Sequence, residues 1–366
     1  MRITAAVAWE TGQPLRLEEV DLDEPRDDEI LVRIEAAGSC HTDQRARDRE
    51  VPIRLPMILG HEGSGVVERV GTAVTAIGPG DKVLLTPDYC GRCPQCLSGR
   101  TPYCDDNVAL TFGGRRADGS PRAHRGDTEV PAMFFGQSSF ATHSLATQRN
   151  AMKVPAEADL TLLAALGCGI QTGAGAILNA MPVAAGGSVA VFGAGAVGLS
   201  AVMAAVASGA GQVIVIDRVA ARLALAAELG ATHTIDTSAG SDVAAEIRDH
   251  TGGGCEVAFD STGVPELIAT AVESTATRGV CGFVAGAGRQ LTVPMMSLLY
   301  KGRSLRGIMG GDGRADLLLA RLIALHERGR FPFERLIRHY RFEEVNTAMA
   351  DSASGATIKP VLLMGR

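Results

Sequence analysis

The order of apolar and polar side chains gives the chain two different textures. Residues 29–36 and 63–70 alternate apolar and polar positions, which is typical of strands with one buried face. This pattern predicts an all-β first part. From residue 187 onward, short apolar runs alternate with helical patterns, which predicts a doubly wound parallel sheet. The predicted strands are 189–192, 213–216, 232–235, 257–260, 280–284 and 305–308, and the predicted helices include 199–208, 220–229 and 265–276.

The last part of the chain returns to a mixed pattern. Residues 314–328 predict an amphipathic helix, and residues 357–364 predict a strand that rejoins the first part. Since 366 residues are too many for one ordinary core, we expect a two-domain α/β protein. The expected domains are 1–155 with 310–366, and 156–309. Residues 112–131 have no apolar period and many turn residues, so we expect a surface loop there.

Charge and hydropathy exclude some classes of partner. The 35 basic and 41 acidic residues give a net charge of −6 without a block of Lys or Arg, so we expect no nucleic-acid partner. The first residues show no signal-peptide pattern, and we expect a cytoplasmic protein. No charged residue or His lies between Asp159 and Asp217, but Gly and Pro interrupt this stretch repeatedly. We therefore expect buried strands and helices there rather than a membrane span.

A glycine-rich turn follows the predicted strand that ends at Phe192. Gly193, Gly195 and Gly198 have the GxGxxG spacing and precede a helical pattern. Such a turn lets a backbone approach a pyrophosphate, which the helix N-terminus then binds through unpaired N–H groups. Asp217 ends the next strand, where a carboxylate accepts hydrogen bonds from the adenosine ribose and repels a 2′-phosphate. The motif predicts NAD rather than NADP; the alternative is a glycine turn in an α/β domain that binds no dinucleotide.

Four cysteines are closely spaced in the first part of the chain. Cys90, Cys93, Cys96 and Cys104 form Cys-x2-Cys-x2-Cys-x7-Cys. Four thiolates can close a tetrahedral zinc shell without an open position, so this cluster predicts a structural zinc site. An iron–sulfur cluster and a nucleic-acid zinc ribbon are the alternatives, and the acidic net charge opposes the second.

Several motifs in order resemble the zinc-dependent medium-chain alcohol dehydrogenases. They are GSCHTD at 38–43, GHEGSGVVERVG at 60–71, the cysteine cluster, GCGIQTGAGA at 167–176 and FGAGAVG at 192–198. The resemblance extends over essentially the whole chain. The segment FFGQSSFA at 134–141 is most similar to the bacterial aryl-alcohol branch. The resemblance implies a GroES-like β-rich catalytic domain, a Rossmann domain, and a homotetramer or homodimer. It also implies oxidation of a primary, aryl or allylic alcohol to the aldehyde with NAD.

The resemblance also assigns site residues. Cys40, His61 and Cys168 would hold a catalytic zinc, which brings the total to two zinc ions per subunit. Two thiolates and one imidazole leave a fourth position at which the metal acidifies an alcohol. Glu62 would exchange as a transient ligand, and Asp43 would orient His61.

Further residues of the family are matched around this centre. Thr42 would hydrogen-bond the alcohol oxygen, but Arg45 stands where some relatives complete the proton relay with a His. Cys255 and Cys281 match no ligand position, and we expect them to be buried structural residues. The predicted cofactor contacts are His41 and Lys359 at the pyrophosphate, Thr172 and Val197 at the nicotinamide, and Arg222 at the adenosine ribose.

Two other functions are compatible with parts of the sequence. A zinc-free quinone or enone reductase of the same superfamily would lack the full ligand set present here. A non-catalytic sensor of zinc and dinucleotide would keep Asp217 and the cysteine cluster but would need neither Cys40 nor Thr42. Metal content separates the first alternative from a zinc enzyme.

Overall fold

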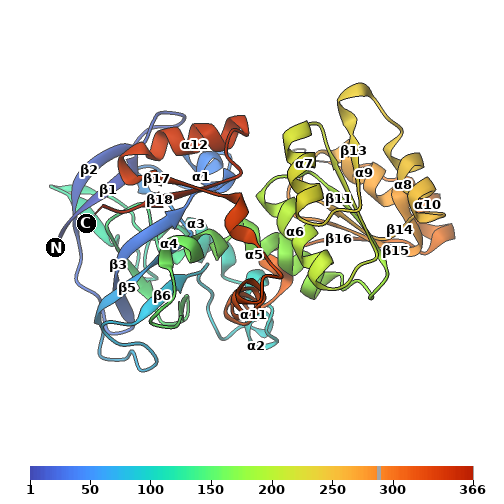
Figure 1. The fold of residues 1–366 in the computed structure, drawn as a ribbon. Helices are drawn as coiled ribbons and strands as arrows, with labels where there is room; N and C mark the ends of the chain where they lie inside the picture. Colours follow the sequence, from blue (N-terminus) through green and yellow to red (C-terminus); the bar gives the residue numbers. More distant parts are fainter. Residues whose placement is uncertain (287–289, 366) are drawn as a thin grey trace. The chain divides into compact units, whose positions relative to one another are not determined.

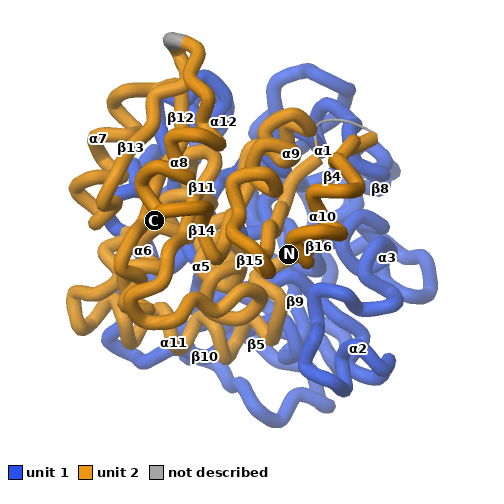
Figure 2. The backbone as a smooth tube through the Cα atoms, turned by 90° about the vertical axis from the view of Figure 1, so that its right-hand side faces the viewer, with its two compact units in different colours: residues 1–168, 334–366 blue, residues 169–333 orange. Residues whose placement is uncertain are grey.

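The computed structural model describes residues 1–286 and 290–365, which form two compact units (Figure 2). Unit 1 comprises Met1–Cys168 with Glu334–Arg366, and unit 2 comprises Gly169–Phe333. These limits differ from the predicted domains 1–155 with 310–366 and 156–309. Helix α4 (Leu160–Leu163) packs on strands of unit 1, and α11 (Ala315–Glu327) packs on α5 (Gly169–Gly175) within unit 2. The predicted domain limits stay a prediction.

Unit 1 is built on two sheets, with strand orders β4-β1-β2-β7-β8 and β10-β6-β5-β3-β18-β17, and with β9 added to β3 (Figure 1). Strand β18 pairs antiparallel with β3, which confirms that the last strand rejoins the first part of the chain. The strands are β1 (Arg2–Ala8), β2 (Arg16–Leu22), β3 (Glu29–Gly38), β4 (Met57–Ile58), β5 (Gly63–Val70), β6 (Lys82–Leu85), β7 (Ala123–Arg125), β8 (Thr128–Glu129), β9 (His143–Thr147), β10 (Ala151–Lys153), β17 (Ile337–Arg341) and β18 (Lys359–Leu363).

Helices α1 (His41–Arg47), α2 (Pro94–Leu97) and α3 (Asn107–Phe112) lie in the first part of the chain, so the expectation that this part is all-β is wrong and β-rich is the better description. Unit 1 also contains α4 and α12 (Val345–Ser354). These helices are short, and their apolar period is too brief to distinguish from a loop in the sequence. Short 3-10 helices lie at Thr101–Tyr103, Phe134–Gly136, Ala164–Gly167, Phe333–Leu336 and Phe342–Glu344.

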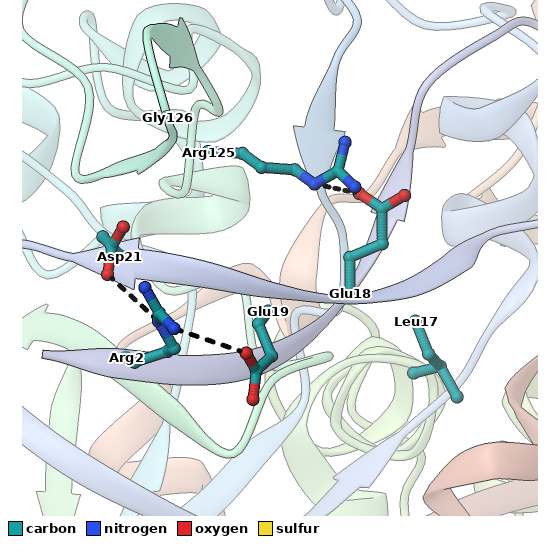
Figure 3. A pocket seen from close by; sticks show the side chains of 7 residues that line it. All are labelled: Arg2, Leu17, Glu18, Glu19, Asp21, Arg125 and Gly126. Carbon is teal, nitrogen blue, oxygen red and sulfur yellow. Dashed lines mark ion pairs between the residues drawn. The ribbon is translucent and has the colours of Figure 1, made fainter.

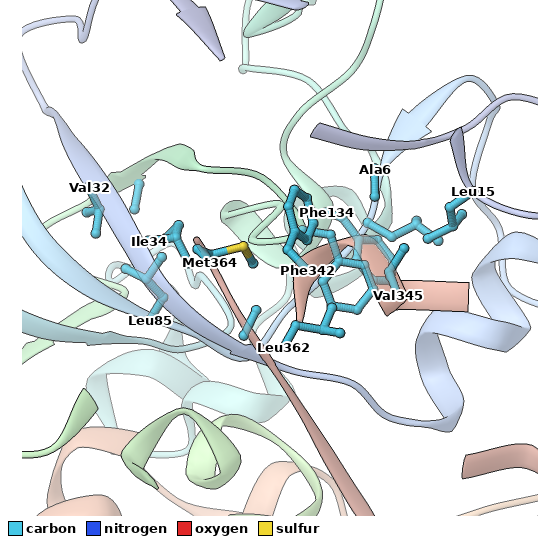
Figure 4. Packing of buried hydrophobic residues seen from close by; sticks show 14 of the residues in the cluster. Ala6, Leu15, Val32, Ile34, Leu85, Phe134, Phe342, Val345, Leu362 and Met364 are labelled. Carbon is cyan, nitrogen blue, oxygen red and sulfur yellow. The ribbon is translucent and has the colours of Figure 1, made fainter. Parts of the chain in front are cut away.

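The core of unit 1 follows from alternation along β3. Ile30, Val32 and Ile34 are buried in one apolar cluster, and Leu31 is buried in another. A strand that contributes to two clusters is covered on both faces, which makes β3 the structural centre of this unit. Figure 4 shows the first cluster, where residues of β3 meet side chains from distant parts of the chain, including Leu85, Phe134, Phe342, Leu362 and Met364.

The predicted surface loop at 112–131 is partly wrong. The segment contains β7 and β8, and it buries Arg116 and Arg122, whose side chains are 6% and 2% exposed. Both guanidinium groups bind Glu29, with N–O distances of 2.9 Å. Burial by itself raises the pKa of Glu29, but the hydrogen bond from Arg116 and the charge of Arg122 leave it lowered. The sequence showed only charged residues, which are exposed unless a partner is buried with them.

Unit 2 is the predicted doubly wound fold. Its six strands are all parallel, in the order β13-β12-β11-β14-β15-β16, which confirms the predicted strands to within a few residues. They are β11 (Ser188–Phe192), β12 (Gln212–Asp217), β13 (His233–Asp236), β14 (Cys255–Asp260), β15 (Thr275–Phe283) and β16 (Ser304–Gly307). The helices besides α5 and α11 are α6 (Ala196–Ala207), α7 (Ala220–Glu228), α8 (Val243–Thr251), α9 (Pro265–Ser274) and α10 (Met295–Lys301), with a π-helical turn at Ala176–Ala180 and 3-10 helices at Thr237–Ala239 and Gly310–Asp312.

Two details of unit 2 bear on the sequence predictions. Cys255 and Cys281 are fully buried, as expected, and burial raises the pKa of Cys255 to about 11. Within the described residues, no single helix is both long and apolar enough to cross a membrane, although 160–167 with 169–180 passes as a bent pair by length and composition.

Candidate active site

The three predicted ligands of the catalytic zinc converge in unit 1. Cys40 caps the N-terminus of α1, His61 lies just before β5, and Cys168 follows a short 3-10 helix. One ligand atom of each, together with a Glu62 oxygen, lies within 4.8 Å of the others. Cys40 Sγ and His61 Nε2 are 3.2 Å apart. Two sulfurs and an imidazole nitrogen gathered in this way form a donor set that suits zinc.

Asp43, the residue expected to orient His61, lies in hydrogen-bond contact with its imidazole. The side chain is fully buried, and its Oδ1 lies 3.0 Å from His61 Nδ1 and accepts from the Gly60 amide at 3.1 Å. Its Oδ2 accepts from the Cys40 amide at 3.0 Å. Burial lowers the pKa of His61, but the charges of Asp43 and then Cys40 raise it well above its usual value. With Nδ1 donating to Asp43, Nε2 faces the thiolates.

Glu62 forms a buried ion pair that the sequence did not predict. Lys359 Nζ, on β18, donates to Glu62 Oε2, while Oε1 has no partner among the described residues. Burial raises the pKa of Glu62 to about 7 despite the charge of Lys359. A Cβ at Gly38 would lie 2.0 Å from Glu62 Oε2, so a larger residue at this position would displace the Glu62 carboxylate. A Lys within the apolar run IKPVLL was the one available signal of a buried partner.

Aromatic rings cover His61. The Phe135 ring is stacked on the imidazole, with centroids 4.5 Å apart, and Phe134 meets it edge-on at 5.5 Å. Phe112 packs on Phe135, with centroids 5.7 Å apart. The side of the metal centre near His61 is therefore apolar and aromatic.

The remaining residues matched on α1 have different surroundings. Thr42 is half-buried, and its amide donates to Cys40 Sγ at 3.3 Å, which keeps it beside the metal ligands. Arg45 pairs with Glu50 at 3.3 Å, and His41 is exposed.

The predicted structural site is also assembled. The sulfurs of Cys90, Cys93, Cys96 and Cys104 lie within 4.8 Å of one another. Backbone amides point at them: the Cys93 amide donates to Cys90 Sγ at 3.4 Å, and the Cys90 amide to Cys104 Sγ at 3.3 Å. Amide donors from Asp105 and Cys96 lower the pKa of Cys93 to about 6. Four converging sulfurs with amide donors fit a tetrahedral metal.

The glycine turn of unit 2 has the geometry that the motif predicts. Gly193 has a φ of +92°, and a Cβ at Gly198 would lie 1.7 Å from the Gly193 carbonyl oxygen. Gly195 caps α6. Asp217 is already engaged at this turn, because Oδ2 accepts from the Ala194 amide at 2.6 Å. Its Oδ1 accepts from the two amides that follow it, at 2.7 and 2.9 Å.

Three further predicted cofactor residues belong to unit 2. Val197 is half-buried in the first turn of α6. A Cβ at Gly173 would lie 1.9 Å from the Val197 carbonyl oxygen, so α5 packs closely on α6 and Thr172 is next to that contact. Arg222 lies on α7, and its buried Nε has no partner among the described residues. An unpaired buried donor here fits an anionic or hydroxyl-bearing ligand. His41 and Lys359 belong to unit 1.

A surface hollow lies apart from both metal clusters (Figure 3). Its charged side chains bind one another. Arg2 pairs with Glu19 and Asp21 at 3.7 and 3.6 Å, and Arg125 pairs with Glu18 at 3.1 Å. Such exposed pairs form a solvated surface and do not indicate a binding site.

The chain matches two protein families over most of its length. Residues 26–156 match the alcohol dehydrogenase GroES-like domain, and residues 196–324 match the zinc-binding dehydrogenase family. The chain is 45% identical to geraniol dehydrogenase of Castellaniella defragrans, over 98% of this chain and 97% of that protein.

Solved structures agree with this family. A zinc-binding alcohol dehydrogenase domain protein from Burkholderia ambifaria is 47% identical, with a TM-score of 0.98 and complete coverage of both chains. Benzyl alcohol dehydrogenase from Acinetobacter calcoaceticus is 40% identical, with a TM-score of 0.96 and equally complete coverage. The chain therefore belongs to the zinc-dependent medium-chain alcohol dehydrogenases, enzymes that use zinc and a nicotinamide dinucleotide.

Proposed function

We propose that this enzyme oxidises primary alcohols in which the carbinol carbon is attached to an aromatic ring or a double bond, with NAD as the acceptor. The observation that carries this proposal is the aromatic cluster of Phe112, Phe134 and Phe135 on His61. Flat, unsaturated groups pack well against aromatic rings. Two relatives named for geraniol and for benzyl alcohol support the same class, since one alcohol is allylic and the other benzylic.

We propose that Cys40, His61 and Cys168 hold the catalytic zinc and that Glu62 exchanges as a transient ligand. When bound, the zinc would supply a Lewis acid for the alcohol oxygen and the dinucleotide would supply the hydride acceptor. Thr42 accepts the alcohol proton through its hydroxyl and passes its own proton on. Arg45 cannot continue that relay, because a guanidinium keeps its proton near neutral pH.

A second zinc is proposed for the four-cysteine cluster, which gives two zinc ions per subunit. The four sulfurs would fill a tetrahedral shell and leave no open coordination position, which supports a structural role. Elemental analysis of purified enzyme tests the count. One zinc per subunit or none would contradict it.

NAD preference is proposed to rest on Asp217, which would accept from the ribose hydroxyls and repel a 2′-phosphate. Around it, we propose that Gly193, Gly195 and Gly198 approach the pyrophosphate and that Arg222 lies near the ribose. Thr172 and Val197 would border the nicotinamide, and His41 and Lys359 would contact the pyrophosphate.

One kinetic series tests substrate and cofactor together. Benzyl, cinnamyl, geranyl and short aliphatic alcohols are compared with NAD and NADP by kcat/KM. We expect the three unsaturated alcohols and NAD to be preferred, and Asp217→Ser to shift the NAD to NADP ratio towards NADP. Equal efficiency for aliphatic alcohols would contradict the substrate proposal, and an unchanged cofactor ratio would remove Asp217 from its role.

We propose that the enzyme is a homo-oligomer, a homotetramer or a homodimer. Among the described residues, β16 hydrogen-bonds only to β15, and the neighbouring α10 exposes large apolar side chains. Leu299 is 66% exposed and Tyr300 is 79% exposed. An open strand edge beside an apolar helix suits pairing with a second copy. Leu299→Asp should shift the sedimentation coefficient towards the monomer, and an unchanged value would contradict this surface. We also propose a cytoplasmic location, because a reducing compartment keeps metal-binding thiols from forming disulfides.

A further inference from the structure

The segment Phe134–Ser138 wraps around His61 in an unusual backbone conformation. Phe135 has a φ of 54°, Gly136 of 78° and Ser138 of 60°. Residues other than glycine rarely adopt this left-handed backbone conformation, and each one that does costs of the order of 1 to 3 kcal/mol. Two of them in four residues require contacts that hold the turn in place.

Buried hydrogen bonds supply those contacts. Ser138 Oγ donates to the Ile58 carbonyl at 2.6 Å and accepts from the Phe134 amide at 2.8 Å. Arg122 Nη1, itself buried, donates to the Gly136 carbonyl at 2.9 Å. The turn is thus fixed from both sides, and its strain serves to direct the side chain between Gly136 and Ser138.

That side chain is Gln137, which is fully buried and whose amide contacts the backbone on both sides of Glu62. Its Oε1 accepts from the Gly63 amide at 3.0 Å, and its Nε2 donates to the His61 carbonyl at 3.0 Å. Nε2 also lies 3.4 Å from the Thr86 carbonyl oxygen. One amide therefore fixes the backbone before and after Glu62, while Phe135 from the same turn covers the imidazole.

We propose that Gln137 is a positioning residue for the reactive metal centre. It acts through the backbone of His61, and so holds the imidazole Nε2 of His61 beside the sulfurs of Cys40 and Cys168. This inference rests on the proposed role of His61 as a zinc ligand. It adds that a residue 76 positions from His61 in the sequence contributes to the zinc affinity of the site.

The chemistry of the side chain is specific. An amide has a donor at one atom and an acceptor at the other, and the two backbone groups require one of each. An apolar side chain of similar length, as in Gln137→Met, leaves the Gly63 N–H and the His61 carbonyl without this partner. Removing one partner from buried polar groups is costlier than removing both.

The chain contains a matched control. Asn346 makes the same kind of clamp in unit 1, where Oδ1 accepts from the Leu15 amide at 2.8 Å and Nδ2 donates to the Leu15 carbonyl at 2.9 Å. Leu15 adjoins no metal ligand in the sequence. Asn346→Leu therefore removes a comparable clamp without touching the metal centre.

The test compares Gln137→Met and Asn346→Leu in the full-length zinc enzyme. Zinc affinity is measured by competition with a chelating dye, and the visible spectrum is recorded after cobalt substitution at the catalytic site. Partners of metal ligands typically affect metal affinity about 10 to 100-fold. We expect Gln137→Met to weaken one zinc of the two by that factor and to shift the cobalt bands. Asn346→Leu should lower the melting temperature only. Wild-type zinc affinity and cobalt spectrum in Gln137→Met would overturn the proposal.

Two further variants separate the possible failures. Gln137→Asn is one methylene shorter and can keep one of the two bonds, so it should fold and show a smaller shift in the same direction. Wild-type zinc binding in this variant would also overturn the proposal. His61→Gln reports on the proposed function itself, because it must lose the catalytic zinc. If His61→Gln loses that zinc and both Gln137 variants retain it, only the role of Gln137 is refuted.

Discussion

Asp43→Asn removes one charge and one hydrogen-bond acceptor from the reactive centre while it keeps the shape of the side chain. Three N–H groups converge on the native carboxylate, from His61 Nδ1, the Gly60 amide and the Cys40 amide. The asparagine oxygen can replace Oδ1 and accept from the first two. Its NH2 group then faces the Cys40 N–H, donor against donor. Turning the amide over moves the conflict to His61 and Gly60.

The size of the effect follows from this count. At least one buried N–H is left unsatisfied in either orientation, which costs about 1 to 3 kcal/mol. Loss of a partner of a metal ligand typically weakens metal affinity about 10 to 100-fold. That factor corresponds to about 1.4 to 2.8 kcal/mol. The two estimates agree, so we expect zinc affinity to fall within this range.

Zinc competition and thermal unfolding measure the two consequences. Asp260→Asn is the control, because Asp260 is also fully buried and accepts from the Thr262 and Gly263 amides, at 3.1 and 2.8 Å, but lies in unit 2. Its third donor is the Thr262 hydroxyl, which can turn and accept instead. We expect the control to keep zinc affinity. Wild-type zinc affinity in Asp43→Asn would refute the reasoning.

Three other predictions concern the cysteine cluster, the proton path and the buried ion network. Cys93→Ser should lose the structural zinc and about 4 kcal/mol or more of stability. An unchanged melting temperature with full zinc content would contradict the assignment of the cysteine cluster as a zinc site. Thr42→Val should lower kcat about 100 to 10,000-fold with normal zinc and NAD binding, whereas Arg45→Ala should change kcat little; steady-state kinetics decide between these outcomes. Glu29→Gln should cost about 3 to 5 kcal/mol at neutral pH, because two buried guanidinium groups lose their counter-charge. Since the pKa of Glu29 is lowered in the folded state, that contribution is complete above about pH 4.5 and is lost as the pH falls through the folded pKa, so wild type and variant should converge in acid. A constant difference in unfolding free energy down to acid pH would contradict this.

The sequence predicted features that short stretches determine. The six parallel strands are apolar runs because both faces of that sheet are covered, and glycine turns mark where the runs end. The four-cysteine cluster was predicted from the spacing of its cysteines, and the other metal cluster was predicted from the family motifs. Such local patterns need no knowledge of the rest of the fold.

The features that sequence analysis missed depend on distant partners. Arg122 looks like a surface residue until Glu29, 93 positions earlier, is placed beside it. Gln137 and Gly63 are 74 positions apart, and nothing in either segment indicates that they meet. The cost of burying a polar group is visible in a sequence, but the partner that offsets it depends on the fold.

The bond between Glu62 and Lys359 also determines when the reactive unit can be completed during synthesis. The two residues are separated by 297 positions, and the whole of unit 2 lies between them. At about 5 to 20 residues per second, a ribosome needs about 15 to 60 s to reach the lysine after the glutamate. Throughout that interval the sheet of unit 1 that contains β3 lacks β18, and the Glu62 carboxylate lacks Lys359 as its counter-ion. A transcript truncated anywhere within unit 2 would therefore yield a unit 1 without β18 and without Lys359, even though every proposed zinc ligand had already been translated.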